Sequence, residues 1–170
     1  SPSEWDNFTK KALSSGYKKA YLEKTGLTIV KPHQSYDRFR NRVIFPIHNL
    51  AGRIVGFGGR ILTNEKNKPK YLNSPESEIY NKRKILYGIY FAKNAIVKED
   101  RCHLVEGYTD VISLYQAGVK NVVASSGTSL TEEQIRLIKR YTQNVVILYD
   151  GDPAGLKASV VQGESSSNRG

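Results

Sequence analysis

Three carboxylate residues are placed so that they could hold a divalent metal ion. Glu106 is followed by Gly107, and Asp150 and Asp152 are separated by Gly151. Glu106 and Asp150 each directly follow a short apolar run, so each is expected at the carboxyl end of a β-strand. Ligands of an open parallel sheet bind outside the carboxyl ends of its strands, so we expect the acids to converge at one edge. Carboxylates this close repel unless a cation lies between them, and Mg²⁺ takes such hard oxygen ligands.

These acids also have a purely structural interpretation. Asp150-Gly-Asp-Pro153 has the composition of a surface turn, because Asp, Gly and Pro favour turns. Glu106 on its own would then be an ordinary loop acid. An acid at the end of a second strand, in the same predicted crevice, favours the functional interpretation. An EF-hand is excluded because Ala154 and Val161 stand where calcium ligands would be needed.

The elements predicted around the acids alternate between strands and helices. Strands are expected over 102–106, 121–124 and 145–149, and helices over 109–117, from 129 or 131 to about 141, and over 153–161. Such alternation predicts a parallel sheet.

The preceding part of the chain has a different pattern. Helices are predicted over 4–14 and 17–24, strands over 43–47 and 53–57 with a turn between them, and mostly loop over 63–84. Tyr90 and Phe91 are expected in the core. The predicted fold class is α/β, and its three predicted parts are an α+β basic subdomain at 1–98, a partial parallel-sheet domain at 99–162, and a disordered tail or added residues at 163–170.

Positive charge is concentrated in the first part. The whole chain has 26 Lys and Arg against 16 Asp and Glu, a net charge of +10. Residues 1–98 hold 19 basic and 7 acidic residues, a net +12, and residues 99–170 hold 7 and 9, a net −2. This asymmetry favours an anionic partner bound by the first part and other chemistry in the second. A basic surface kept for solubility is the alternative interpretation.

Composition excludes several classes of protein. No stretch has the roughly 18 apolar residues of a membrane helix, and no signal peptide begins the sequence, so no membrane partner is expected. One cysteine, Cys102, cannot form an internal disulfide, and with three scattered histidines it makes no zinc site. A reducing, cytoplasmic location fits best. The chain has no Met, which favours a segment of a longer protein.

The acidic and basic segments together resemble a known family. Glu106-Gly-Tyr-Thr-Asp110 and Asp150-Gly-Asp-Pro-Ala-Gly155 resemble the two acidic motifs of the Toprim fold, which primases, topoisomerases and some nucleases share. From about Trp5 to Ala158, the order and spacing of motifs resemble the catalytic core of bacterial replicative DNA primases, the DnaG type. The basic segments that carry this resemblance are Ser35-Tyr-Asp-Arg-Phe-Arg-Asn-Arg-Val-Ile-Phe-Pro-Ile47, Gly56-Phe-Gly-Gly-Arg60, Lys70-Tyr-Leu-Asn-Ser-Pro-Glu76 and Leu86-Tyr-Gly88.

The resemblance implies synthesis of short RNA primers on single-stranded DNA from nucleoside triphosphates, by Mg²⁺- or Mn²⁺-dependent nucleotidyl transfer. Glu106 would be the essential acid, as a metal ligand or general base. Asp150 and Asp152 would hold the metal, with support from Asp110. The positions that match template, primer or nucleotide contacts in the family are Arg38, Arg40, Arg60, Lys70, Tyr71, Asn73 and Lys82. The resemblance also implies a location in the bacterial replisome. It further implies that the whole protein binds a replicative helicase through a C-terminal domain absent here.

The sequence also departs from the family. It lacks the amino-terminal zinc-binding domain and a further acidic motif downstream of Asp152, so we expect this segment alone to bind DNA weakly and to make no primers. Two alternatives remain open. A Toprim-type topoisomerase or nuclease fragment would not require Tyr71-Leu-Asn-Ser-Pro75, and a non-catalytic single-stranded DNA-binding module would not require Glu106, Asp150 and Asp152 together.

Overall fold

The structure is a computed structural model of the 170-residue chain, and it describes residues 1–63, 68–127 and 129–149. The chain divides into two compact units. The first comprises Ser1–Ile47 and Ile54–Asn81, and the second comprises His48–Arg53 and Lys82–Gly170. None of the described helices is both long enough and apolar enough to cross a membrane.

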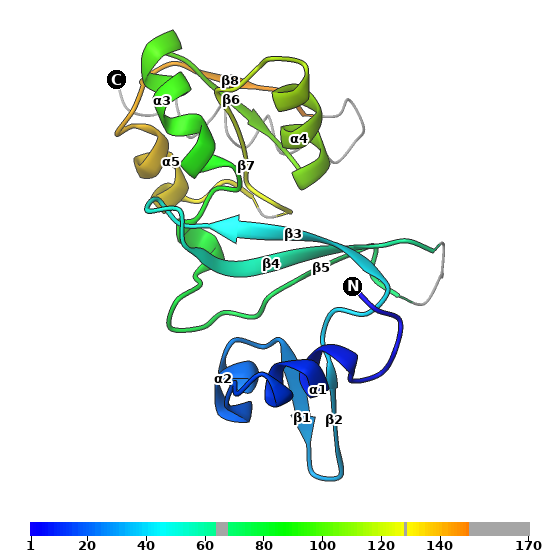
Figure 1. Ribbon diagram of the computed structural model, residues 1–170. Helices are drawn as coiled ribbons and strands as arrows, with labels where there is room; N and C mark the ends of the chain where they lie inside the picture. Colours follow the sequence, from blue (N-terminus) through cyan, green and yellow to red (C-terminus); the bar gives the residue numbers. More distant parts are fainter. Residues whose placement is uncertain (64–67, 128, 150–170) are drawn as a thin grey trace. The chain divides into compact units, whose positions relative to one another are not determined.

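The first unit contains two helices, a hairpin and an antiparallel sheet (Figure 1). Strands β1 and β2 pair antiparallel, and β3, β4 and β5 form a three-stranded sheet in that order. The last residue of β3, His48, already belongs to the second unit. The elements are α1 (Asn7–Ser14), α2 (Lys19–Lys24), β1 (Thr28–Lys31), β2 (Gln34–Asp37), β3 (Arg42–His48), β4 (Ile54–Ile61) and β5 (Tyr71–Asn73).

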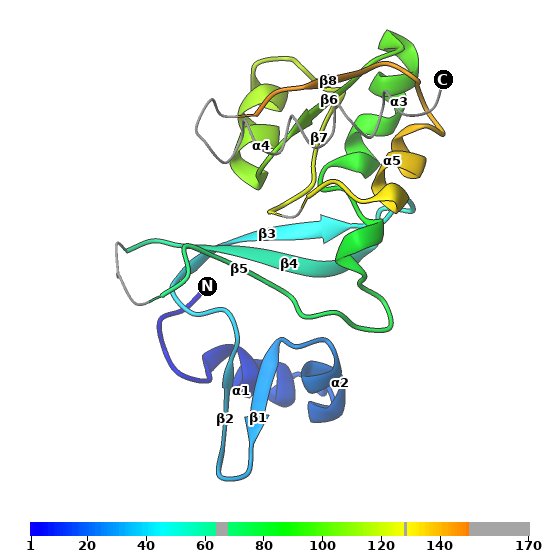
Figure 2. The same cartoon turned by 180° about the vertical axis from the view of Figure 1, so that it is seen from behind.

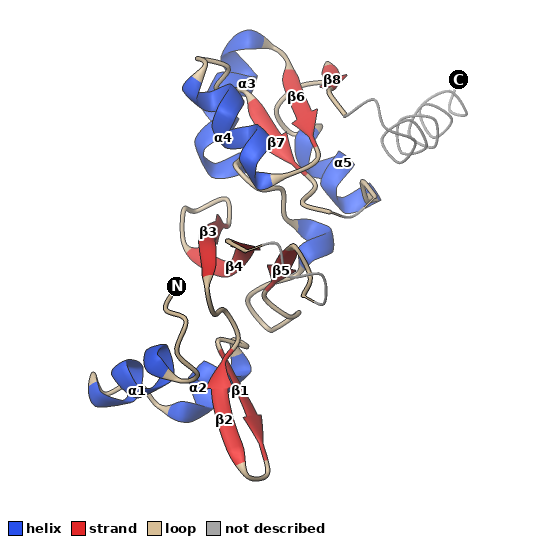
Figure 3. Cartoon of the chain, turned by 90° about the vertical axis from the view of Figure 1, so that its right-hand side faces the viewer, coloured by secondary structure: helices blue, strands red, loops and turns tan. Residues whose placement is uncertain are grey.

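A buried acid joins α1 to the hairpin beside which it lies in Figure 3. The Asp37 carboxylate accepts hydrogen bonds from the backbone N–H groups of Phe8 and Thr9, at 2.7 and 2.9 Å, and from the Thr9 hydroxyl at 2.6 Å. The N-cap residue itself, Asp6, makes no side-chain capping bond. The unpaired N–H groups of the first helical turn are therefore satisfied by a residue 28 or 29 positions away, which fixes the helix against β2.

The second unit is a parallel sheet with helices on both faces. The strand order is β7-β6-β8, and β6 pairs parallel with both neighbours. The crossover connections of a parallel sheet need helices, and α4 and α5 supply them here. The elements are the 3₁₀ helix η1 (Lys82–Lys84), α3 (Ile89–Glu99), β6 (Cys102–Val105), α4 (Tyr108–Gln116), β7 (Val122–Ala124), α5 (Glu132–Ile138) and β8 (Val145–Ile147).

Successive residues of the central strand pack on opposite faces. Leu104 belongs to a buried cluster with residues of α3 and α5, whereas Val105 belongs to a second cluster with Val111 of α4. Figures 1 and 2 show α3 and α5 on one side of the sheet and α4 on the other. The two clusters make a core on each face, as expected for a strand buried on both sides.

The structure confirms the α/β fold class, including the three predicted parallel strands and the helices expected after the first two of them. The predicted helix over 153–161 lies outside the described residues. The expectation of mostly loop over 63–84 was incomplete, because β5 and η1 lie there. The hairpin β1–β2 and the helix α3 had not been predicted. The predicted domain boundaries, 1–98, 99–162 and 163–170, stay predictions.

Candidate active site and nucleic-acid surface

Glu106 lies at the carboxyl end of the central strand of the parallel sheet. It directly follows β6, and the next residue, Gly107, is the N-cap of α4. The Glu106 carbonyl accepts a hydrogen bond from the backbone N–H of Ser126 at 3.1 Å, and its Oε1 atom is buried. The predicted essential acid therefore lies at the edge where sheets of this kind bind their ligands.

The neighbouring strand β8 runs in register toward the same edge. Leu104 is paired with Ile147, and the N–H of Leu148 donates to the Leu104 carbonyl at 2.8 Å. Glu106 lies two residues after Leu104, and Tyr149 lies two residues after Ile147, so the chain leaves both strands at the same edge. Asp150 and Asp152 lie outside the described residues, and their convergence with Glu106 stays a prediction.

Asp110 has a structural task in addition to its predicted one. Its Oδ2 atom accepts a hydrogen bond from the Gly107 N–H at 2.9 Å, which closes the first turn of α4. A carboxylate here also interacts favourably with the helix dipole. One carboxylate oxygen is therefore engaged in capping, and any support for a metal ion would come from the other oxygen.

Ser126 adjoins Glu106, and the sequence reasoning missed it. The residue has a left-handed backbone with φ of 61°, and its Oγ is buried with no hydrogen-bond partner among the described residues. Gly127, with φ of 80°, continues the left-handed segment. Non-glycine residues rarely adopt this conformation, and such strain is concentrated at functional sites. The signal available in the sequence was the Ser-Ser-Gly run directly after the apolar strand.

Lys82, a predicted nucleotide contact, lies in η1, whose backbone is held by the start of α5. The fully buried Gln134 side chain donates from Nε2 to the carbonyls of Lys82, at 3.2 Å, and Ile85, at 2.8 Å. The Thr131 hydroxyl donates to the Arg83 carbonyl at 2.6 Å. Thr131 and Gln134 also form the capping box of α5, so the same two side chains fix the helix start and the η1 segment.

In the first unit, β4 and β5 bring three predicted contact residues onto one face. Arg60 is paired directly with Tyr71, and Asn73, two residues further along β5, is paired with Gly58. Directly opposite residues of an antiparallel pair share a face, and so do residues two apart in a strand. The other face is core, because a Cβ on Gly59 would lie 2.7 Å from the Phe39 ring. Arg60 and Tyr71 are exposed.

Two arginines connect this ladder to neighbouring segments. Arg38 donates from Nε to the Asn73 carbonyl at 3.0 Å, and burial lowers the pKa of its guanidinium. Arg42, which is buried, donates from Nη1 to the carbonyls of Gly59, at 3.2 Å, and Lys70, at 3.3 Å. Arg42 therefore fixes the backbone of the predicted contact residue Lys70.

Arg40 forms a separate stack with two aromatic rings. Its guanidinium carbon lies 4.1 Å from the centroid of the Trp5 ring and 5.0 Å from that of the Tyr36 ring. The two rings are themselves 4.9 Å apart, and Trp5 is 50% exposed. An exposed aromatic ring beside a cation is the arrangement on which bases of single-stranded nucleic acid stack.

Nine of the eleven predicted site residues lie within the described segments, and Asp150 and Asp152 lie outside them. The first unit holds Arg38, Arg40, Arg60, Lys70, Tyr71 and Asn73, and the second holds Lys82, Glu106 and Asp110. Tyr90 and Phe91 were wrongly expected in the core: they are 37% and 54% exposed and contact His48. Among residues 1–63, 68–127 and 129–149, no group of three or more His, Cys, Asp or Glu residues is placed to hold a metal.

An acid at the carboxyl edge of a parallel sheet is the arrangement of the Toprim class, and residues 103–166 match the family described as Toprim-like. Residues 1–93, more than half of the chain, match the family described as DNA primase catalytic core, N-terminal domain. The chain therefore belongs to the DnaG-type DNA primase family, as its motifs had indicated. Toprim and primase proteins generally depend on divalent metal, and the assignment of Glu106 as a ligand stays a prediction.

Individual proteins show the same relationship. A DNA primase of Clostridium acetobutylicum is 50% identical over 158 residues, which are 92% of this chain and 26% of the relative. The RNA polymerase domain of Mycobacterium tuberculosis primase DnaG matches with a TM-score of 0.88 and 36% identity, over 96% of this chain and 56% of that one.

Two further solved structures are similar. The Escherichia coli primase catalytic core has a TM-score of 0.86 and 44% identity, over 98% of this chain and 53% of that one. A DnaG primase catalytic domain bound to single-stranded DNA has a TM-score of 0.85 and 44% identity, over the same shares. The chain spans about a quarter of the length of the curated relatives.

Proposed function

We propose that this chain is the catalytic-core part of a DNA primase, which synthesises short RNA primers on single-stranded DNA from nucleoside triphosphates. The observation that carries the proposal is the position of Glu106, directly after the central strand of the parallel sheet and beside a β8 strand that runs in register toward the same edge. The family to which the chain belongs supports the same reaction.

Glu106 would hold a metal ion or accept the proton of the attacking 3′-hydroxyl. Asp150 and Asp152 follow β8 in the sequence and would supply further carboxylate ligands, and Asp110 would contribute the oxygen that does not cap α4. Mg²⁺, or Mn²⁺ in its place, would neutralise the charge that develops on the transferred phosphoryl group. The backbone bond from Ser126 would keep Glu106 at the strand end while the substrate binds.

The basic first unit would bind the template and primer. The Arg60, Tyr71 and Asn73 face offers a cation, a ring and an amide side by side, and Lys70 adjoins it. Arg40 with Trp5 would stack a base, and Lys82 would contact the triphosphate. Contacts of this kind bind phosphate and base faces without reading sequence. The structure neighbour bound to single-stranded DNA supports this assignment.

The remaining partners follow from the same proposal. The RNA primer and nucleoside triphosphates would bind here, and the replicative helicase would bind elsewhere in the whole protein. We place the protein in the bacterial cytoplasm, at the replisome. The related primases come from bacteria, which supports this location.

Template-directed ribonucleotide incorporation by the full-length protein tests the proposal. Glu106→Gln keeps the size of the side chain and removes its charge, so primer synthesis should be lost while affinity for single-stranded DNA stays the same. The matched control is Glu99→Gln, an exposed acid of the same unit, which should leave both quantities unchanged. Undiminished synthesis by Glu106→Gln would refute the proposal, and DNA binding by a wild-type protein that makes no primers would favour a binding module.

A further inference from the structure

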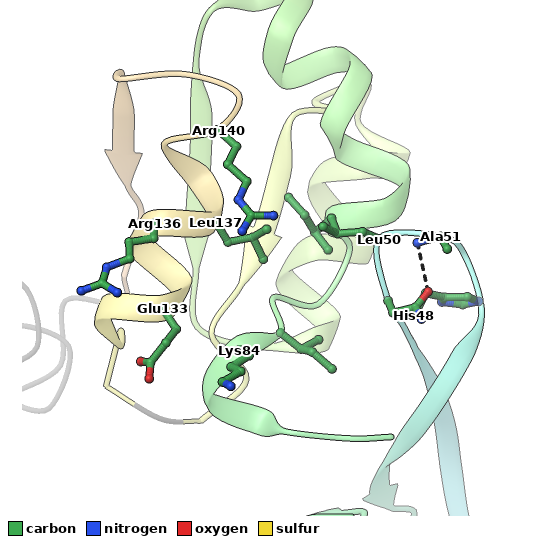
Figure 4. Close-up of a pocket in the computed structure, with 11 residues that line it drawn as sticks. His48, Leu50, Ala51, Lys84, Glu133, Arg136, Leu137 and Arg140 are labelled. Carbon is green, nitrogen blue, oxygen red and sulfur yellow. Dashed lines mark hydrogen bonds between the residues drawn. The ribbon is translucent and has the colours of Figure 1, made fainter. Parts of the chain in front are cut away.

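The second unit contains a pocket of about 540 Å³, whose lining includes none of the residues assigned above, although Lys84 of its lining shares η1 with Lys82. Its walls come from the end of β3 and the turn after it, from the end of η1 and the start of α3, and from α5 and the turn that follows it. All of them are parts of one unit (Figure 4). Small-molecule sites in proteins commonly have volumes of roughly 300–1,000 Å³. The pocket is thus large enough for a small organic ligand.

The floor of the pocket is apolar. Ile89 and Leu137 belong to the buried cluster on the α3 and α5 face of the sheet, and Leu50 packs against that cluster. Ile85 completes the floor. A ligand with a flat, partly apolar body would cover these side chains and remove their surface from water.

The rim carries an excess of positive charge. Lys84, Arg136 and Arg140 line the pocket with one acid, Glu133. Arg136 pairs with Glu132 at 3.2 Å and points away from the pocket in Figure 4. Arg140 extends from the turn after α5 toward the middle of the pocket, and no described residue pairs with its side chain. A guanidinium with no partner among the described residues is therefore an anchor for an anion, and a phosphate fits its planar donors.

The other end of the pocket offers a donor and an acceptor together. Glu133 and Lys84 both line this end. A backbone hydrogen bond at the start of α5 lowers the pKa of the Glu133 carboxyl, with smaller effects from Arg83, Thr131 and Lys84, so Glu133 stays ionised. An ammonium beside a carboxylate complements a ring edge that presents an acceptor next to a donor. Nucleobases present such edges.

We propose that this pocket binds a free nucleoside phosphate, with the phosphate at Arg140, the base at Lys84 and Glu133, and the sugar over the apolar floor. The pocket has one carboxylate and needs no divalent ion. Binding here is therefore independent of the metal-dependent reaction proposed at Glu106, and the two sites can be tested separately.

The test is titration of the full chain with a fluorescent ADP derivative in the presence of EDTA, followed by anisotropy. Arg140→Glu should weaken binding by about tenfold or more, because it replaces the phosphate anchor with a like charge. The control is Lys139→Glu, which makes the same change in charge at the adjacent exposed position outside the pocket and should change the affinity less than about twofold. Pyrophosphate, which has no base, should compete much more weakly than ADP.

Four results would overturn the proposal. Equal losses in the two charge variants would mean that ADP responds to net charge alone. Equal competition by pyrophosphate and ADP would show that the base contributes nothing to binding. A single-stranded oligonucleotide could displace the probe, and Arg140→Glu could weaken the binding of both equally. The pocket would then be part of a nucleic-acid surface instead. Absence of saturable ADP binding to the folded wild type would likewise contradict it.

Discussion

The side-chain Nε2 of Gln134 donates a hydrogen bond to the carbonyl oxygen of Ile85 at 2.8 Å, and the glutamine has no exposed surface. Its amide also reaches the Lys82 carbonyl, and its Oε1 accepts from the Thr131 N–H at 3.1 Å. A single polar side chain therefore ties the start of α5 to the segment that carries Lys82. Both groups of the buried amide are satisfied, as the interior of a protein requires.

Gln134→Leu should destabilise the protein by about 3 kcal/mol, because it leaves buried carbonyl and N–H groups without partners. Denaturant unfolding measures this loss. The control Gln143→Leu changes an exposed residue and should cost less than about 0.5 kcal/mol. Equal losses for the two variants would show that the buried amide contributes nothing specific.

The left-handed segment beside Glu106 predicts a reciprocal pair of stability changes. Ser126→Gly should stabilise the fold by about 1 kcal/mol, since glycine adopts φ of 61° without a Cβ clash. Gly127→Ala should destabilise it by a similar amount, about 1 kcal/mol. A Cβ at Gly127 meets no atom within 4 Å, so the cost there is confined to the backbone.

Ser126→Ala separates backbone strain from the hydroxyl. It keeps the left-handed backbone and removes an oxygen that has no partner among the described residues, so thermal unfolding should move little. If Ser126→Ala stabilised the protein as much as Ser126→Gly does, the buried hydroxyl would be the source of the destabilisation. That result would contradict the attribution to the left-handed backbone.

Trp5 should report directly on the binding of single-stranded DNA. It is the one tryptophan of this sequence and is half exposed beside Arg40, so base stacking should quench its fluorescence. Arg40→Ala should weaken binding by about fivefold and reduce the salt dependence by about one counterion. Lys18→Ala, an exposed change in the same unit, should do neither. If the Trp5 fluorescence were unchanged at saturation with an oligonucleotide, Trp5 would not be part of the DNA-binding interface.

Alkaline pH should unfold the protein through two buried groups. Burial raises the pKa of the Cys102 thiol from 9.0 to about 12, and burial with the nearby Glu76 raises that of Tyr80 from 10.0 to about 12. Both groups are neutral when protonated, so their contribution to stability is complete below about pH 9 and is lost as the pH rises toward 12. Unfolding followed against pH measures this loss.

The same burial makes Cys102, the one cysteine of the sequence, unreactive in the folded state. A disulfide reagent should fail to modify it at pH 8 under native conditions and should react promptly in denaturant. Rapid modification of the native protein would show that β6 is more accessible than the structure has it.

The sequence predicted the elements that have strong apolar patterns. The strands β6, β7 and β8 are short apolar runs, and Thr131, one of the two predicted helix starts, is the N-cap of α5. The hairpin β1–β2 was missed because Gln34 and Ser35 are polar, and α3 because its N-cap, Gly88, has no capping side chain. Its exposed face carries Tyr90 and Phe91, whose apolar character suggested burial.

Site residues could be predicted from the sequence where the residue type and its position after a strand were sufficient. Glu106 follows a strand and is acidic, so its place at the sheet edge could be inferred. The capping bond of Asp110, the clamp of Gln134 and the strain at Ser126 could not, because each depends on where a distant or adjacent backbone group lies in the fold.

The central claim is that Glu106 and the acids after β8 share one metal site. A crystal of the full-length protein soaked with Mn²⁺ and a nucleotide, examined by anomalous scattering, tests it most directly. The account predicts an anomalous peak at about 2.0–2.3 Å from a Glu106 carboxylate oxygen and from Asp150 or Asp152. A manganese ion bound only at other residues, with nucleotide present and Glu106 without metal, would contradict it.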